Sequence, residues 1–343
     1  MGRKPTVNLN LPPYMRRRAW GGKVYYYLRS TIDGKRKEFP LGSDFILALR
    51  KYTELVVIEA PCHAVTFSDV EKRYQAEVVP KLAKNTAKIY RSDIRHLLET
   101  FKDAPLDQVK PMNIRMFLDD RAAIPTTANR CKRLFSTMWN HARGWGYTDL
   151  PNPCEGIKGH SLDKRMLYVT DAMYNAVYAQ GSASLREAMD LAYLTGQRPA
   201  DALRMSEHDI MDGYLIITQA KTKQPLRITI AGKLAELMAR IHERKAAHKI
   251  VTAGLLTNTN GKRLTPAVLR NHFDEARKKA AAVHPEMADA IMAFHFYDLR
   301  AKAADDTSDQ RGDQAASDLL GHGNVKTTQR HYLRRGKIVG ATK

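Results

Sequence analysis

The sequence predicts a multidomain protein that is mainly helical and carries small β-sheets. The chain has 343 residues, more than one ordinary compact domain holds, and 43% of them are hydrophobic, as in globular proteins. Its local character changes twice, so that residues 1–60 favour strands, residues 65–155 favour helices and residues 166–343 favour both. We therefore expect a β-rich N-terminal module, an all-α domain and a mixed α+β domain.

The N-terminal segment, residues 1–60, predicts a small basic sheet followed by one helix. β-Branched and aromatic residues at 23–29 favour a strand, Asp33-Gly34 is typical of a hairpin turn, and residues 36–42 predict the returning strand. Residues 1–40 hold ten lysines and arginines against two acids. The tyrosines could serve packing alone, but so much positive charge on so small a sheet favours a nucleic-acid-binding module.

The helical segment carries two amphipathic helices, each with a basic and an apolar stripe. Basic stripes are often only solvated faces. Two of them in a protein of formal net charge +20 favour contact with a DNA backbone instead, although the alternative of a merely soluble basic protein stays open. The residues expected to contact DNA are Lys84, Lys88, Arg91, Arg95, Arg130 and Arg133.

The chain's cysteines and hydropathy argue against several other classes of protein. Cys62, Cys131 and Cys154 are scattered without the spacing of a metal site or a disulfide framework, which indicates a reducing compartment. The sequence has neither an apolar run of membrane-spanning length nor a signal peptide. We expect a cytoplasmic protein without metal or membrane attachment.

The mixed segment follows a polar, glycine-containing stretch, residues 155–165, that predicts an interdomain linker. Residues 185–194 predict a helix that ends at Thr195-Gly196. Residues 214–218 and 226–230 predict two strands that flank the turn at 221–225.

Four motifs in this segment carry residue types suited to phosphoryl transfer onto a side-chain nucleophile. Gly196 can make the turn that places Arg198 just before a helix, and Lys221 falls in the predicted β-turn. The other two motifs are Tyr297–Arg300 and Leu319–Tyr332. Each alone has an ordinary explanation in packing, pairing or turn formation, and only their order along the chain and their sequence contexts together indicate this chemistry.

Those motifs resemble the catalytic domain of the tyrosine recombinases, which include phage integrases. The resemblance covers residues 166–336 and depends on Leu194–Arg198, Asp298–Lys302 and Leu319–His322 as a set. Residues 65–160 resemble the family's helical, SAM-like core-binding domain more loosely, and residues 1–60 its arm-binding module.

The resemblance implies a role for each candidate residue. Arg198 and Arg300 would bind the scissile phosphate, because a guanidinium suits phosphate recognition, and Asp201 would orient Arg198. Lys221 would protonate the leaving oxygen, and His322 would donate a hydrogen bond to the phosphate. Tyr332 would attack phosphorus to give a 3′-phosphotyrosine. This exchange of phosphodiesters needs neither ATP nor a cofactor.

The chain departs from the family pattern at two places. Tyr297 stands where the family usually has a histidine, and it could donate the same hydrogen bond, although His295 lies close by. The step from His322 to Tyr332 is ten residues, one longer than the family pattern, and His331 could be the extra residue.

The resemblance implies a phage integrase that recombines double-stranded DNA at attachment sites as a homotetramer, for integration and excision of a mobile element. DNA-bending and excision proteins would assist it. Two alternatives remain: a DNA-binding protein of the same fold with weakened catalysis, for which Tyr297 is the best support, and an RNA-binding protein with coincidental motifs.

Overall fold

The computed structural model describes residues 11–12, 14–32, 35–59, 64–249, 251–336 and 339–342. It divides the chain into two compact units, Met1–Asp163 and Lys164–Lys343, which are described separately below. The division into 1–60, 65–155 and 166–343 stays a prediction. The predicted turn at Asp33-Gly34 and Cys62 lie outside the described residues.

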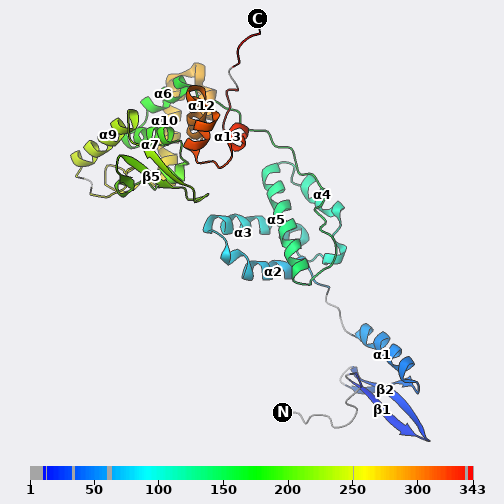
Figure 1. The fold of residues 1–343 in the computed structure, drawn as a ribbon. Helices are drawn as coiled ribbons and strands as arrows, with labels where there is room; N and C mark the ends of the chain where they lie inside the picture. Colours follow the sequence, from blue (N-terminus) through cyan, green and yellow to red (C-terminus); the bar gives the residue numbers. More distant parts are fainter. Residues whose placement is uncertain are drawn as a thin grey trace. The chain divides into compact units, whose positions relative to one another are not determined.

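The N-terminal residues form an antiparallel sheet with the order β1-β2-β3 and one helix (Figure 1). The strands are β1 (Met15–Trp20), β2 (Lys23–Ile32) and β3 (Lys35–Gly42), and the helix is α1 (Phe45–Glu59). A small core of Met15, Leu28, Leu41 and Ala48 joins sheet and helix. β1 was not predicted, because only Met15 of its six residues is buried and its three arginines hide any alternation.

Four α-helices follow in the first unit: α2 (Phe67–Glu77), α3 (Lys84–Phe101), α4 (Pro111–Asp119) and α5 (Pro125–Gly144). Short 3-10 turns η1 (Val79–Lys81) and η2 (Leu106–Gln108) lie between them. The core of these four helices is rich in aromatic residues, and the ring centres of the stacked Phe67 and Phe135 are 4.9 Å apart. The predicted helical domain and its two amphipathic helices are therefore present.

The two basic stripes differ in how their charges are used. On α3, Lys84, Lys88, Arg91 and Arg95 are all exposed. On α5, Arg133 is exposed, but Arg130 donates two hydrogen bonds of 2.6 Å to Asp93, which is fully buried. Arg130 therefore compensates a buried carboxylate, and a sequence pattern cannot reveal such a partner 37 residues away.

The predicted linker is partly docked onto the first unit. Asn129 of α5 exchanges two 2.8 Å hydrogen bonds with the backbone of His160, and the His160 ring bonds the Leu118 carbonyl at 2.9 Å. Arg165 pairs instead with Asp298 of the second unit. His160 is therefore bonded to the first unit, and Arg165 belongs to the second.

The second unit is mainly helical and contains one small antiparallel sheet of order β4-β5-β6. The strands are β4 (Ile210–Met211), β5 (Tyr214–Thr218) and β6 (Pro225–Thr229), after the 3-10 turn η3 (Glu207–Asp209). The helices are α6 (Asp171–Ala179), α7 (Ala183–Thr195), α8 (Pro199–Ala202), α9 (Lys233–Ala247), α10 (Pro266–Val283), α11 (Ala288–Ala293), α12 (Asp298–Leu320) and α13 (Val325–His331), with η4 (Pro285–Met287) before α11.

Helix α7 is the centre of this unit, with most of its apolar residues fully buried, and it packs against α12 and α9 (Figure 1). This packing holds the C-terminal ends of α7 and α12 next to each other. Within the described part of the chain, no helix is both long and apolar enough to cross a membrane.

Candidate active site

Arg198 reaches the site through a turn that requires glycine. Helix α7 ends at Thr195, and Gly196 adopts φ +63°. A Cβ on Gly196 would lie 3.1 Å from side-chain atoms of Leu319 and Leu320, so the turn also needs the missing side chain for close packing. The result places Arg198 beside the end of α12, where the motif Leu319–His322 begins.

Two neighbours hold the Arg198 side chain and the start of α8. Its Nη1 donates a 3.0 Å hydrogen bond to Oε1 of Gln219. Asp201 lies 3.9 Å from Nη1, and its Oδ1 accepts a 2.8 Å hydrogen bond from the backbone N–H of Ala220. Asp201 thus contacts the turn between β5 and β6 more closely than it contacts Arg198.

Arg300 is a buried cation without a buried anion. Its side chain is 1% exposed, and its guanidinium donates to the carbonyls of Gly196 at 2.7 Å and Leu320 at 2.8 Å. Burial lowers its pKa. Among the described residues no carboxylate forms an ion pair with Arg300, and its Nε has no hydrogen-bond partner. An isolated buried charge is costly, so the site favours an incoming anion.

His322 lies between Arg300 and helix α13. Its Nε2 is 3.2 Å from Nη2 of Arg300, and its Nδ1 is 2.8 Å from Oγ1 of Thr328. Because arginine is only a donor, Nε2 accepts, and the proton of the neutral ring resides on Nδ1 and is donated to Thr328. Burial and the charges of Arg300 and Arg198 lower the pKa of His322 to about 4, so the ring is neutral at physiological pH.

Tyr332 follows the last turn of α13 and points at Tyr297. The two hydroxyl oxygens are 2.9 Å apart. The Tyr332 side chain is buried, with its ring 5.0 Å from that of His322 and the Arg300 guanidinium 5.2 Å from the ring centre. Tyr332 is therefore in contact with three other candidate residues, Tyr297, His322 and Arg300.

The two tyrosines differ in acidity. Burial raises the pKa of Tyr332, but the hydrogen bond from Tyr297 and the charges of Arg300 and Arg198 outweigh it, and the net pKa lies below the usual 10. Burial and the contact with Tyr332 raise the pKa of Tyr297 to about 12. Tyr332 therefore ionises first, while Tyr297 keeps its proton and donates.

Lys221 lies in the exposed turn between β5 and β6, as the sequence predicts. Its side chain makes no hydrogen bond or ion pair with the residues that the structure describes. The turn itself is fixed by backbone bonds from Gln219 to Gln224 and from Lys223 to Gln219. Lys221 is thus a free ammonium group on a well-defined turn.

His295 and His331 stay outside this cluster. His295 is exposed, and its backbone N–H, not its ring, bonds Asp298 at 2.8 Å. His331 is exposed at the end of α13. Three further residues of the cluster were not singled out from the sequence: Gln197, Gln219 and Thr328. Their side chains matter through tertiary hydrogen bonds that no local pattern displays.

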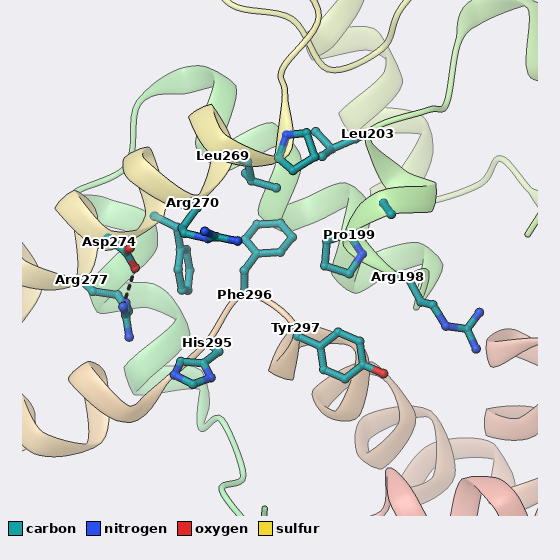
Figure 2. A pocket seen from close by; sticks show the side chains of 13 residues that line it. Arg198, Pro199, Leu203, Leu269, Arg270, Asp274, Arg277, His295, Phe296 and Tyr297 are labelled. Carbon is teal, nitrogen blue, oxygen red and sulfur yellow. Dashed lines mark hydrogen bonds and ion pairs between the residues drawn. The ribbon is translucent and has the colours of Figure 1, made fainter. Parts of the chain in front are cut away.

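A cavity of about 670 Å³ opens beside the cluster. In Figure 2, Phe296 lies at its centre, Arg198 and Tyr297 lie on one side, and the Asp274–Arg277 ion pair lies on the other. Tyr332 does not line the cavity. The Tyr332 hydroxyl therefore lies in the arginine cluster and not in this cavity.

Known proteins resemble the chain over nearly its whole length. Residues 168–337 match the phage integrase family. The integrases of Enterobacteria phage 434 and Escherichia phage lambda are each 26% identical to the chain, and that of Escherichia phage HK022 is 27% identical, over 98% of both chains in each case.

Solved structures of lambda integrase share the fold. A dimer bound to a COC′ core site has a TM-score of 0.69, with 97% of this chain and 98% of that chain covered. A tetramer bound to a Holliday junction has a TM-score of 0.70, with 97% and 99% covered, and both are 23% identical to this chain. The predicted fold class is confirmed, residues 168–337 belong to the phage integrase family, and the chain is a site-specific tyrosine recombinase.

Proposed function

We propose that the chain cuts and rejoins duplex DNA at attachment sites through a 3′-phosphotyrosine formed on Tyr332, for integration and excision of a mobile element. One observation carries the proposal: buried Arg300, which has no carboxylate partner among the described residues, lies with its guanidinium 5.2 Å from the centre of the Tyr332 ring and shares the site with Arg198. A phosphodiester supplies the anion that this arrangement lacks, and its phosphorus is the electrophile that a tyrosine attacks.

The cleavage step exchanges one phosphorus–oxygen bond for another. Oη of Tyr332 forms a bond to phosphorus while the bond from phosphorus to O5′ breaks. The phenolic proton leaves to solvent, and Nζ of Lys221 gives a proton to O5′, which yields a 5′-hydroxyl. Attack of a 5′-hydroxyl on the phosphotyrosine reverses the step and frees Tyr332. Arg198 and Arg300 stabilise the charge on the non-bridging oxygens.

Tyr297 has a distinct role in this proposal. Its hydroxyl donates to the oxygen of Tyr332, the atom on which negative charge develops, and the 2.9 Å contact supports this role. With a pKa of about 12 it is a donor and not a base at neutral pH. Tyr297 thus favours ionisation of the nucleophile.

His322 joins the phosphate site as a neutral ring. Its low pKa reflects burial and two arginines whose charge a bound phosphate would offset. If Arg300 turns toward the phosphate, Nε2 loses its donor and can take the proton, provided that Thr328 donates its hydroxyl hydrogen to Nδ1. His322 then donates to a phosphate oxygen.

The rest of the chain would serve binding and assembly. We propose that Lys84, Lys88, Arg91, Arg95, Arg130 and Arg133 contact the DNA backbone near the core site and that residues 1–60 bind separate arm sites. Arg130 stays in this proposed set, because its side chain is 37% exposed although its Nε and Nη2 bond Asp93. A homotetramer would perform both strand exchanges with the help of DNA-bending and excision proteins, in the bacterial cytoplasm where the DNA lies.

The test is trapping of a covalent adduct on a nicked suicide duplex. The parent chain should give a denaturation-resistant protein–DNA band, and Tyr332→Phe should bind the duplex with unchanged affinity but give no band. An adduct that persists in the Phe variant would assign the nucleophile elsewhere. Failure of the parent to form an adduct with its own attachment site would favour the alternative, a DNA-binding protein with weakened catalysis.

A further inference from the structure

Gln219 is a buried amide whose hydrogen-bonding capacity is fully used. The residue is 0% exposed and follows β5, just before the turn that carries Lys221. Its Oε1 accepts from Nη1 of Arg198 at 3.0 Å and from Oγ1 of Thr222 at 2.7 Å. Its Nε2 donates to Oε1 of Gln197 at 2.7 Å and to the carbonyl of Leu320 at 2.9 Å. One side chain thus contacts four separate groups of the site.

The two ends of this amide have different tasks. The Nε2 end is anchored to the frame of the site, because the Leu320 carbonyl also accepts from Nη2 of Arg300 at 2.8 Å. Packing at this anchor is tight, since a Cβ on Gly321 would lie 2.9 Å from Nε2 of Gln219. The Oε1 end holds one phosphate-binding arginine, Arg198, and one residue of the turn, Thr222.

We propose that Gln219 is a positioning residue that couples the placement of Arg198 to the placement of the turn that carries Lys221. This inference rests on the proposed roles of those two residues. Lys221 itself has no partner among the described residues, so its position depends on how the turn is held. Asp201 adds a second tie, because its carboxylate accepts from Ala220 in the same turn.

The coupling has a chemical purpose. Protonation of O5′ is useful only when the phosphate is already held by Arg198, because a displaced ammonium group gives no proton to the leaving oxygen. Because Oε1 of Gln219 accepts from both Arg198 and Thr222, one rigid amide fixes Arg198 and the turn relative to Arg300. A glutamate of the same size would not serve, because its second oxygen would face two acceptors, Oε1 of Gln197 and the Leu320 carbonyl.

The test compares two leaving groups on the same suicide duplex. One substrate has the natural O5′, and the other has sulfur at that bridging position, whose thiolate leaves without a proton. The variants are Lys221→Ala, Thr222→Val and Gln219→Met, with Thr229→Val as the matched control at the far end of the same hairpin. Single-turnover cleavage rates and DNA affinity are measured for each, with thermal unfolding to confirm that Gln219→Met is folded.

Thr222→Val removes only the side-chain hydrogen bond from the turn to Gln219 and leaves the backbone bonds of the turn in place. It should slow cleavage of the oxygen substrate by about threefold to tenfold, the effect of one hydrogen bond, and cleave the sulfur substrate at the parental rate. Gln219→Met removes the hydrogen bonds to both Arg198 and Thr222. The sulfur substrate should therefore restore only part of the lost cleavage rate, because Arg198 stays misplaced. Thr229→Val should match the parent on both substrates.

The outcomes separate the coupling from the proposed function beneath it. Parental cleavage of the oxygen substrate by Thr222→Val would overturn the coupling, and so would a slow sulfur reaction in Thr222→Val while Lys221→Ala is restored. If sulfur fails to restore Lys221→Ala, the acid role of Lys221 is wrong and the coupling falls with it. Because Thr222 is exposed, its variant keeps the test valid even if Gln219→Met does not fold.

Discussion

Replacement of Tyr297 by phenylalanine isolates a single hydrogen bond in the active site. The change keeps the ring that lines the cavity and removes only the hydroxyl that lies 2.9 Å from the oxygen of Tyr332. Together with the charges of Arg300 and Arg198, that hydroxyl lowers the pKa of Tyr332, the proposed nucleophile, below the usual 10. Its loss should raise the pKa of Tyr332 and slow attack on phosphorus.

The size of the effect follows from the charge that develops on the nucleophile. A hydrogen bond to a charged group contributes about 1.5–3 kcal/mol, which corresponds to a rate change of roughly tenfold to a hundredfold. The loss should be greatest near neutral pH and shrink in alkaline buffer, where Tyr332 ionises without help. DNA affinity should stay unchanged, because Tyr297 carries no charge that binds phosphate.

Single-turnover cleavage of a suicide duplex across a range of pH measures this directly. Tyr297→His, which restores the usual family residue, should keep substantial activity, and His295→Ala should have a small effect, because the His295 ring lies outside the cluster. Parental cleavage by Tyr297→Phe together with an inactive His295→Ala would refute this reasoning and assign the role to His295.

Three further predictions concern other parts of the chain. Deletion of residues 1–60 should leave cleavage of a minimal core site intact and abolish binding to arm sites, and an unchanged footprint on the arm sites would disprove it. Thr328→Val should remove the partner of Nδ1 of His322 and slow cleavage by about threefold to tenfold, with Thr328→Ser near parental; ¹⁵N shifts of the His322 ring report the tautomer. The pKa of His322 in the folded protein is about 4, below its usual 6.5. Its contribution to the free energy of unfolding is therefore present above pH 6.5 and is lost as pH falls toward 4. In urea unfolding, the free energy of unfolding of His322→Asn should not show this loss between pH 6.5 and 4.

Much of the candidate site could be predicted because its residues lie at the ends of regular elements. The helix that stops at Gly196, the turn that carries Lys221 and the glycine before His322 are all marked by local patterns, and the structure has each of them. Their proximity could not be derived from periodicity. It came from the family resemblance, and the structure brings Arg198, Arg300 and Tyr332 together through packing of α7 against α12.

The parts that escaped the sequence depend on partners far along the chain. Arg130 belongs to a basic stripe by its spacing, but its guanidinium forms an ion pair with Asp93 on a neighbouring helix. Gln219 and Thr328 are ordinary polar residues in the sequence, and their importance arises only from what their side chains meet. A basic strand such as β1 has no apolar alternation to detect, because only one of its residues reaches the core.

The charge balance of the site also explains why tyrosine can replace histidine at position 297. His322 shows what the two arginines do to an imidazole in this setting, since burial and their charges lower its pKa to about 4. A histidine at 297 would face the same charges of Arg300 and Arg198 that act on Tyr297, and so would be neutral as well. A neutral imidazole and a neutral phenol can each donate one hydrogen bond to Tyr332. The two residues differ mainly as proton acceptors, and the phenolic proton of Tyr332 can leave instead through solvent at Tyr297, which is 42% exposed. In the proposed mechanism, the substitution therefore keeps a hydrogen-bond donor to Tyr332, and water takes the place of the lost proton acceptor.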